Sequence, residues 1–486
     1  MLGFPENLIF RVSTSLLVVL AVTASGAEAA QGQKHLLEPE KGPAYRQAPP
    51  HPPVAIRKTR SEDVALPFEK RVLRNGLTVL MSPDPTTHEV VVDLSFRAGT
   101  LYEPPRRSGL AHLTEHVVCG GATPETDYGR MLELRGARDV NAFTDLDLMT
   151  FRAVVPPEEL GFALWVADDR LGTLSSRLDP AELERHRRIV QSERALRLLD
   201  VPYGKLSAEV SKRTFPAPHP LHATAFGAPD ELASVTVEDV AAFARQYLVP
   251  ANGILTLVGD FEPATVMRQL EASLERLPRG TRAELPPHAK RPAPLDAHYQ
   301  MKERVARRPR TQVVWNLPYV PNLEADALEL GALLLRIYTD GALGTSLDAG
   351  FLRYSNGALF VVDVTSDRES TPSEGLDTAE GLVRYLTRTA MPDDVVDATF
   401  LAFDIEMLER LDSPTGRASL LTLLEHMDYS PQDAARYTER HWRLTAAGIQ
   451  TAARALLEGP RGVFTALPVR PLPKRAPSRF VERNEE

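Results

Sequence analysis

The 486-residue sequence has little cysteine and no block of basic residues. Its single thiol, Cys119, excludes an intrachain disulfide framework and any metal site built from several cysteines. Lys and Arg number 56 against 65 Asp and Glu, which gives a formal net charge of −9. This mildly acidic balance argues against nucleic acid as the main partner. Hydrophobic residues make up 43% of the chain and charged residues 25%, a composition typical of a globular protein with two or three domains.

Long apolar runs are also scarce. The most apolar stretch, from Leu16 to about Val22, follows Arg11 and precedes Ala27-Glu28-Ala29. It is too short for a stable transmembrane helix, and the order of charge, apolar core and small residues is typical of a secretory signal. We predict a signal peptide at residues 1–29, a mature chain without a membrane span, and export to a bacterial periplasm. A disordered or membrane-anchoring N-terminus is the alternative.

The rest of the chain divides into two similar halves. A slide of 209 positions lays the segment 444–467 on an earlier one without a gap, pairing Thr445 with Thr236, Ile449 with Val240 and Gly462 with Gly253. We infer an internal duplication of an α+β unit, two unrelated helix–strand units being the alternative. The predicted segments are a Pro-rich linker at 30–63, an N-terminal domain at 64–279, a second linker at 280–295 and a homologous C-terminal domain at 296–486.

Local patterns predict the elements of the first half. Asn75-Gly76 between two β-prone runs predicts a hairpin over 72–81. Further strands are expected at 90–96 and 254–258, and helices at 156–171, 181–199 and 237–247. The predicted fold is therefore α+β: two homologous α/β sandwich domains, each with an antiparallel-rich sheet covered by helices.

The most informative segment contains His112, Glu115 and His116 in an H-x-x-E-H pattern. On a helix, positions i and i+4 share a face, so both imidazoles can reach one metal ion. Zinc hydrolases need two such ligands, an open position for water, and a carboxylate that accepts the proton of that water. The pattern therefore predicts a zinc site with Glu115 as the base, a solvated helix face with two histidines being the alternative.

A site of this type needs a third protein ligand, and Glu193 is the best candidate. Its predicted helix begins at a capping residue, Asp179, followed by Pro180, which suits a first helical turn. Glu193 shares an apolar stripe with His186, and a carboxylate in such surroundings needs a partner. A surface acid beside Arg197 is the alternative for Glu193. His186 is either a group that orients a ligand or a packed histidine.

Over about residues 66–486 the chain resembles the inverzincin metallopeptidases, the family of pitrilysin, insulin-degrading enzyme and the mitochondrial processing peptidase. The family motif is H-x-x-E-H followed about 76 residues later by a glutamate, and here 76 residues separate His116 from Glu193. The flanking segments that match are Asn75-Gly76-Leu77, Arg97-Ala98-Gly99, Glu103-Pro104-Pro105, Gly109-Leu110-Ala111-His112, Asn141-Ala142-Phe143-Thr144, Pro202-Tyr203-Gly204 and Tyr247-Leu248-Val249-Pro250-Ala251-Asn252.

The resemblance implies one Zn2+ per chain, bound by His112, His116 and Glu193, with Glu115 as general base. It also implies that Asn141 contacts the backbone of a peptide that adds to the sheet as an extended strand. A turn residue is the alternative role for Asn141. The implied activity is that of a metalloendopeptidase acting on peptides or small unfolded proteins. A non-catalytic zinc-binding or chaperone-like subunit is the alternative, and a structural zinc protein is a further class.

The chain departs from the family pattern at several positions. Cys119 and Gly120 replace the usual aromatic residue and lysine, and His186 replaces the acid seven residues before the third ligand. Family members carry an Arg and, seven residues later, a Tyr in the C-terminal domain; here Arg353 fits, but Phe360 lacks the hydroxyl that donates to an oxyanion. A solvated surface charge is the alternative for Arg353.

The resemblance and these departures lead to a quaternary prediction. Short members resemble half of a clamshell and pair. We predict a heterodimer with a homologous zinc-less subunit that supplies the missing hydroxyl, with a homodimer as the second possibility. The segment 422–426 ends in Glu425-His426 but lacks the first histidine of the motif, and it is interpreted as an ordinary amphipathic helix.

Overall fold

The fold is taken from a computed structural model. It describes residues 66–121, 126–289, 296–318, 320, 322–339, 346–355, 357–367, 370–389, 391–427, 441 and 443–469. The predicted signal peptide and the first linker lie outside these residues. Among the described helices, none combines the length and the apolar character that a membrane crossing requires.

The N-terminal domain is built on a six-stranded sheet with the order β1-β2-β6-β3-β5-β4. Its strands are β1 (Glu69–Val72), β2 (Thr78–Pro83), β3 (Val90–Phe96), β4 (Arg138–Thr144), β5 (Met149–Val155) and β6 (Gly253–Gly259). The hairpin prediction is confirmed: β1 and β2 pair antiparallel, and Gly76 has a φ of 90°, a conformation that glycine adopts without strain. The strands predicted at 90–96 and 254–258 are also present.

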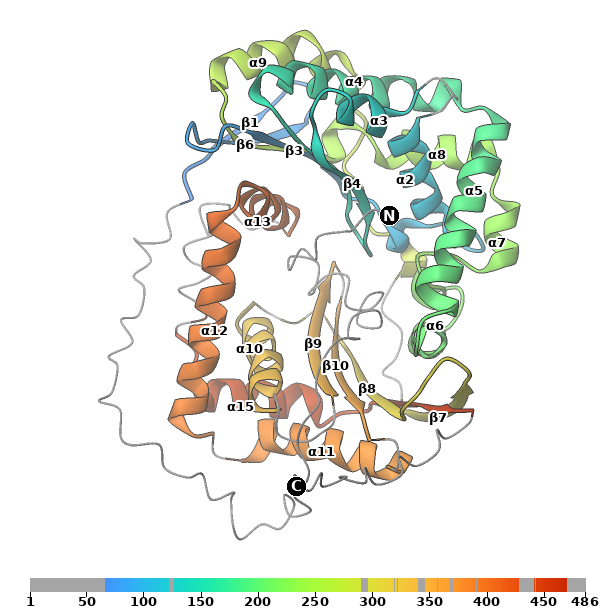
Figure 1. Cartoon of the computed structure of the whole chain (residues 1–486), viewed down its shortest axis with the longest axis vertical. Coiled ribbons are helices and arrows are strands. Elements are labelled where there is room, and N and C mark those ends of the chain that lie inside the picture. Colours follow the sequence, from blue (N-terminus) through green and yellow to red (C-terminus); the bar gives the residue numbers. More distant parts are fainter. Residues whose placement is uncertain are drawn as a thin grey trace, which may run out of the picture.

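The N-terminal domain also contains helices, some of which cover one face of this sheet (Figure 1). They are α2 (Leu110–Gly120), α3 (Tyr128–Glu133), α4 (Leu160–Arg177), α5 (Pro180–Arg194), α6 (Gly204–Thr214), α7 (Pro229–Ser234), α8 (Val237–Tyr247) and α9 (Pro263–Ala272). α2 packs against β4, α5 and α8, and α4 packs against β3 and β5. The core between helices and sheet is apolar, with Phe96, Leu113 and Met149 all fully buried. The edge strand β4 and the helix α2 are thereby held side by side.

The C-terminal domain repeats this plan. Its sheet has the order β7-β11-β8-β10-β9, formed by β7 (Ala297–Glu303), β8 (Arg310–Leu317), β9 (Ser346–Tyr354), β10 (Gly357–Thr365) and β11 (Gly462–Pro468). Its helices include α10 (Asn322–Thr339), α11 (Pro372–Arg388), α12 (Asp393–Asp412), α13 (Pro414–His426) and α15 (Ala446–Leu457).

The two sheets are equivalent strand for strand. The order β2-β6-β3-β5-β4 in one matches β7-β11-β8-β10-β9 in the other, and in each the first pair is parallel and the others are antiparallel. β11 begins 209 residues after β6, and the hydroxyls of Thr236 and Thr445 cap the equivalent helices α8 and α15. The predicted duplication and the α+β class are therefore confirmed.

Each domain also contributes a helix that contacts the sheet of the other domain. α13 of the C-terminal domain packs against β3 and β6 of the N-terminal sheet, and α6 of the N-terminal domain contacts β11 (Figure 1). α13 contains the segment that the sequence analysis interpreted as an ordinary amphipathic helix, and its Leu420, Leu421, Thr422 and Leu424 are buried while Leu423 is exposed. Its Thr422 hydroxyl lies 2.8 Å from that of Thr256, and Ser419 accepts a hydrogen bond from Arg152 at 2.8 Å. A polar contact surface thus joins the domains.

Candidate metal centre

The helix α2 is held at its N-terminus by buried polar groups. Glu103 accepts a hydrogen bond from the backbone N–H of Ala111 at 2.8 Å, and a carboxylate at this end of a helix is favoured by the helix dipole. Burial nevertheless raises the pKa of Glu103 well above its ordinary value. Ser108 donates from both its backbone N–H and its hydroxyl to Glu231 of α7, at 3.0 and 2.7 Å. These contacts fix the helix whose next residues carry the motif.

Three possible ligand atoms converge beside α2. The Nε2 atoms of His112 and His116 lie 3.2 Å apart. Oε2 of Glu193 lies 3.5 Å from Nε2 of His112 and 3.6 Å from Nε2 of His116. The structure thus brings together the three residues that the sequence selected, although Glu193 is far along the chain from the two histidines.

The local sequence explains how Glu193 reaches this position. Asp179 caps α5 by accepting from the backbone N–H of Ala181 at 2.7 Å, and Pro180 occupies the first turn, as predicted. α5 packs against α2 and carries Glu193 in its last turn. Arg197, one turn later, lies 3.9 Å from the Glu193 carboxylate and is largely exposed. Arg197 is therefore a distant partner for an ion pair, and the carboxylate of Glu193 lies closer to the two imidazoles.

The geometry fits a tetrahedral metal site. With metal–ligand distances of about 2.0–2.1 Å, ligand atoms around zinc are roughly 3.3–3.4 Å apart, and the three observed separations span 3.2–3.6 Å. Oε2 of Glu193 is buried and has no hydrogen-bond partner among the described residues. A buried carboxylate oxygen without a donor is costly unless a cation neutralises it. Three protein ligands leave a fourth position open, as catalytic zinc sites do.

Electrostatics favour the ligand forms of these side chains. Burial, together with the neighbouring His116, lowers the pKa of His112 to about 3, so its imidazole is neutral at physiological pH. Burial acts against the charge on Glu193, but the facing imidazoles and Arg197 lower the pKa of its carboxyl to about 2. Burial raises the pKa of Glu115, whose carboxylate lies within 4.8 Å of the ligand atoms of both histidines. A carboxylate with a raised pKa is better suited to accept a proton.

His186 and Gly120, two of the departures from the family pattern, are in contact. His186 is 2% exposed, and its ring centroid lies 6.4 Å from that of His116. A Cβ atom on Gly120 would lie 2.7 Å from Cε1 of His186, closer than real side chains approach. The glycine therefore makes the room that the histidine occupies. Cys119 beside it is half-buried, and burial raises the pKa of its thiol.

We expect Gly120→Ala to lower the free energy of unfolding by about 1–3 kcal/mol, because the new methyl group forces the buried His186 ring to move. Urea unfolding measures this change. Gly350→Ala is the matched control, since a Cβ there meets no atom within 4 Å. An unchanged free energy of unfolding in the Gly120 variant would show that His186 shifts without cost.

Asn141 lies on β4, the edge strand of the N-terminal sheet beside α2. Its side chain is exposed and accepts a hydrogen bond from the backbone N–H of Ala142 at 2.9 Å. In the described sheet, β4 pairs with β5 alone, so its outer edge can accept another strand. The position of Asn141 is thus compatible with the predicted contact to an extended peptide.

The structure places Arg353 and Phe360 away from the three ligands. Arg353 lines a cavity of about 550 Å3 between the two domains, whose lining includes none of His112, Glu115, His116 and Glu193. Phe360 is 0% exposed and packs edge-on against Trp315 in the core of the C-terminal domain, with ring centroids 6.0 Å apart. Within this chain, the position that the family pattern assigns to tyrosine therefore faces a hydrophobic core.

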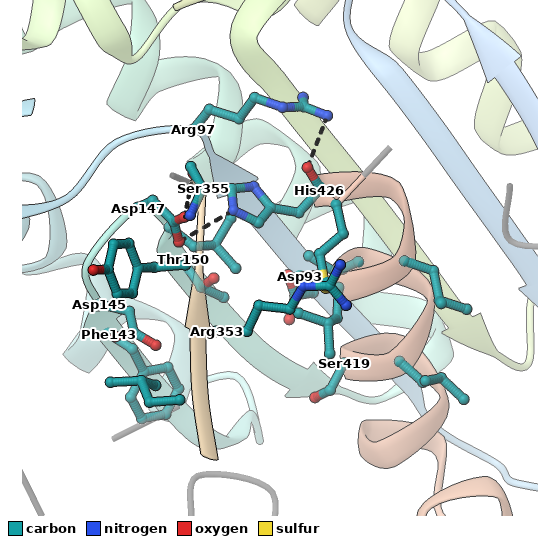
Figure 2. A pocket seen from close by; sticks show the side chains of 18 of the residues that line it. Asp93, Arg97, Phe143, Asp145, Asp147, Thr150, Arg353, Ser355, Ser419 and His426 are labelled. Carbon is teal, nitrogen blue, oxygen red and sulfur yellow. Dashed lines mark hydrogen bonds and ion pairs between the residues drawn. The ribbon is translucent and has the colours of Figure 1, made fainter. Parts of the chain in front are cut away.

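The interdomain cavity contains a contact between a histidine and an aspartate that sequence reasoning missed (Figure 2). Nε2 of His426, the last residue of α13, lies 3.2 Å from Oδ1 of Asp147, and the two side chains are 8% and 13% exposed. Ser355, between β9 and β10, donates its backbone N–H to the same carboxylate at 2.7 Å. Burial raises the pKa of Asp147, but His426 and Ser355 outweigh it and hold the pKa below its ordinary value. No pattern within either segment of the sequence indicates this contact, which is visible only in the tertiary structure.

Comparison with known proteins identifies the family. Residues 78–197 match the sequence profile described as insulinase (peptidase family M16), and residues 234–399 match the profile described as peptidase M16 inactive domain. The two matches together cover more than half of the chain. The chain belongs to the M16 peptidase family. The inverzincin resemblance is thereby confirmed.

M16 relatives with curated names include zinc proteases. The chain is 26% identical over 228 residues to zinc protease PqqE of Helicobacter pylori, a match that covers 46% of this chain and 50% of that protein. It is 33% identical over 118 residues to the insulin-degrading enzyme of Mus musculus, covering 23% of this chain and 12% of the enzyme. The chain spans about half the length, or less, of the curated relatives it matches. These names support a peptidase role.

Solved structures share the fold. A protease from Helicobacter pylori superposes with a TM-score of 0.77 at 19% identity, covering 83% of this chain and 100% of the other. The M16 inactive domain from Pseudomonas fluorescens gives a TM-score of 0.72 at 17% identity, over 83% and 98% of the two chains. The periplasmic protease PqqL of Escherichia coli gives 0.66 at 17% identity, over 82% and 47%.

Proposed function

We propose that this M16 chain is a zinc-dependent metalloendopeptidase that hydrolyses peptides or small unfolded proteins. The observation that carries the proposal is the triangle of ligand atoms from His112, His116 and Glu193, with sides of 3.2–3.6 Å, next to the buried carboxylate of Glu115. One zinc ion held by these three side chains would acidify a bound water to a pKa of about 7 and polarise the scissile carbonyl.

The chain's own residues perform the remaining steps. Glu115 accepts the proton of the attacking water and delivers it to the leaving amine, a task to which its raised pKa is suited. The exposed edge of β4 binds the substrate as an added strand, so that main-chain hydrogen bonds give affinity with loose side-chain specificity. Phe226 contacts the His112 ring edge-on, with centroids 5.4 Å apart, and restrains its orientation.

Metal removal tests the proposal. We expect the purified chain to cleave an internally quenched peptide, to lose that activity after dialysis against a chelator, and to regain it with one equivalent of zinc. Elemental analysis measures the metal, and His112→Ala should remove both the zinc of this site and the cleavage. Cleavage that persists in the metal-free chain would refute a zinc mechanism. Zinc binding without cleavage of any peptide would favour the non-catalytic alternative.

We expect Asn141→Ala to raise KM about 2- to 10-fold with little change in kcat, because one hydrogen bond to the substrate backbone contributes about 0.5–1.5 kcal/mol. Steady-state kinetics with the quenched peptide measure this split. Gln300→Ala is the control, since Gln300 is an exposed polar residue on β7, which forms an edge of the other sheet and is not the equivalent of β4. Equal KM values for wild type and the Asn141 variant would remove Asn141 from the substrate site.

We further propose that the chain is the catalytic half of a dimer. The support is the buried position of Phe360, which offers no hydroxyl to a substrate, and the location of Arg353 in the interdomain cavity. A homologous zinc-less subunit would supply the missing donor, with a second copy of this chain as the other possible partner. One relative is named a probable subunit beta of the mitochondrial-processing peptidase of Schizosaccharomyces pombe.

Light scattering and the activity of the isolated chain distinguish a monomer, a homodimer and a chain that needs a different partner. Full activity of the isolated chain as a monomer would contradict the dimer.

Export completes the proposed function. The PqqL relative of solved structure is described as a periplasmic protease, and the predicted signal at residues 1–29 would place this chain in the same compartment. N-terminal sequencing of the protein recovered from a periplasmic extract tests both the location and the predicted cleavage after Ala29.

A further inference from the structure

The C-terminal domain contains a second group of possible metal ligands. Asp326, Glu329 and His441 each offer one ligand atom, and these atoms all lie within 4.8 Å of one another. Asp326 and Glu329 are one turn apart on α10, so they share a helix face. His441 lies five residues before α15 and more than 100 residues from the two acids. The fold thus assembles this group from distant parts of the chain.

The group is largely enclosed. Asp326 is 1% exposed and His441 is 0% exposed, whereas the side chain of Glu329 keeps 28% of its surface accessible. The His441 ring stacks on Phe403 of α12, with centroids 4.1 Å apart and an angle of 18° between the planes. This stacking fixes the orientation of the imidazole. Glu329 also lines the interdomain cavity, which gives a small solute a route to the group.

The charges and distances favour a cation at the centre. Two neighbouring carboxylates repel each other, and a divalent cation bound between them would relieve that repulsion. Nε2 of His441 lies 3.6 Å from Oε2 of Glu329, beyond the roughly 2.7–2.9 Å of a charge-assisted hydrogen bond. The same separation occurs between His116 and Glu193 in the candidate metal centre, and it is close to the ligand spacing of about 3.3–3.4 Å around zinc.

We propose that Asp326, Glu329 and His441 bind a second divalent cation. One imidazole and two carboxylates form a ligand set that suits zinc. This site differs from the first in composition, and a cation bound there would join α10 to the chain that enters α15. The proposal is independent of the proposed peptidase activity, because it concerns other residues and is read from metal content.

Metal stoichiometry tests the proposal on the full chain. The protein is stripped with a chelator, reconstituted with zinc alone, desalted and analysed for zinc per chain. We expect two equivalents in wild type, one in the double variant Asp326→Asn/Glu329→Gln, one in His112→Ala, and none in the triple variant. Glu406→Gln is the matched control: it is an acid of α12 with 35% side-chain exposure, 3.9 Å from Arg336, and should keep two equivalents.

A second measurement covers the case in which the double variant fails to fold. In the His112→Ala background, zinc should raise the midpoint of thermal unfolding, since a ligand bound to the native state stabilises it. The additional single change Glu329→Gln should weaken this response by about tenfold or more in zinc concentration, as loss of even an outer partner of a ligand costs about 10–100-fold in affinity. The proposal would be overturned if the acid variants bound as much zinc as the wild type, or if the unfolding midpoint did not respond to zinc. The contact between His441 and Glu329 would then be a contact without a metal.

Discussion

Replacing Glu115 by Gln should lower kcat about 10²- to 10⁴-fold while the zinc content of the chain stays the same, because the amide cannot accept the proton of the attacking water. Gln has the shape of Glu, and the proposed zinc ligands are His112, His116 and Glu193 rather than Glu115. Rates of quenched-peptide cleavage and elemental analysis of the same samples measure both quantities.

The control for this experiment is His112→Ala, which should lose zinc from the centre as well as activity. The contrast between the two variants separates a base from a ligand: one loses turnover alone and the other loses both. Wild-type turnover in a Glu115→Gln variant with its zinc intact would exclude Glu115 as the base, and the raised pKa that burial gives this carboxyl would then need another explanation.

Asp93→Asn should lower the free energy of unfolding by about 3–5 kcal/mol, because it leaves the Arg152 guanidinium buried without its counter-charge. Asp93 accepts from Nε of Arg152 at 2.9 Å, and the exposed fractions of the two side chains are 0% and 8%. Arg152 also donates to Ser419 of α13, so the loss affects the contact between domains. Urea unfolding measures the change, which is a large part of a typical stability of about 5–15 kcal/mol.

Glu238→Gln provides the comparison for this prediction. Glu238 pairs with Arg245 on the surface of α8, with side-chain exposures of 76% and 51%, and solvent screens such pairs to about 1 kcal/mol or less. The two substitutions are chemically similar and differ in burial. A loss below about 1 kcal/mol in both variants would show that water reaches the Asp93–Arg152 pair (Figure 2 shows Asp93 beside the cavity).

Much of the fold was predictable because its signals are local. Asn75-Gly76 formed the predicted hairpin, Asp179 and Pro180 began α5, and the 209-residue offset placed α15 and β11 on α8 and β6. Capping, turn chemistry and apolar periodicity act over a few residues, so the sequence alone contains them. The H-x-x-E-H spacing is local in the same sense, since one helical turn brings His112 and His116 to one face.

Contacts between distant segments were not predictable in this way. The sequence predicted an amphipathic helix at α13 but not what it contacts: α13 packs against β3 and β6 of the N-terminal sheet and against α12, and its His426 lies beside Asp147. The stretch contains polar residues on its buried side, which a hydrophobic pattern assigns to solvent. Those residues are buried because the other domain supplies matching polar groups, such as Thr256 for Thr422. No feature of α13 itself records that partner.

The sequence by itself determined the motif on one helix, the cap and start of the helix that carries the third candidate ligand, and the repetition of the domain. Only the tertiary structure decided that Glu193 reaches the two imidazoles, that Phe360 points into a core, and that Asp326, Glu329 and His441 meet. The physical reason is that a helix or a turn depends on neighbours in the chain, whereas convergence of side chains depends on how whole layers pack.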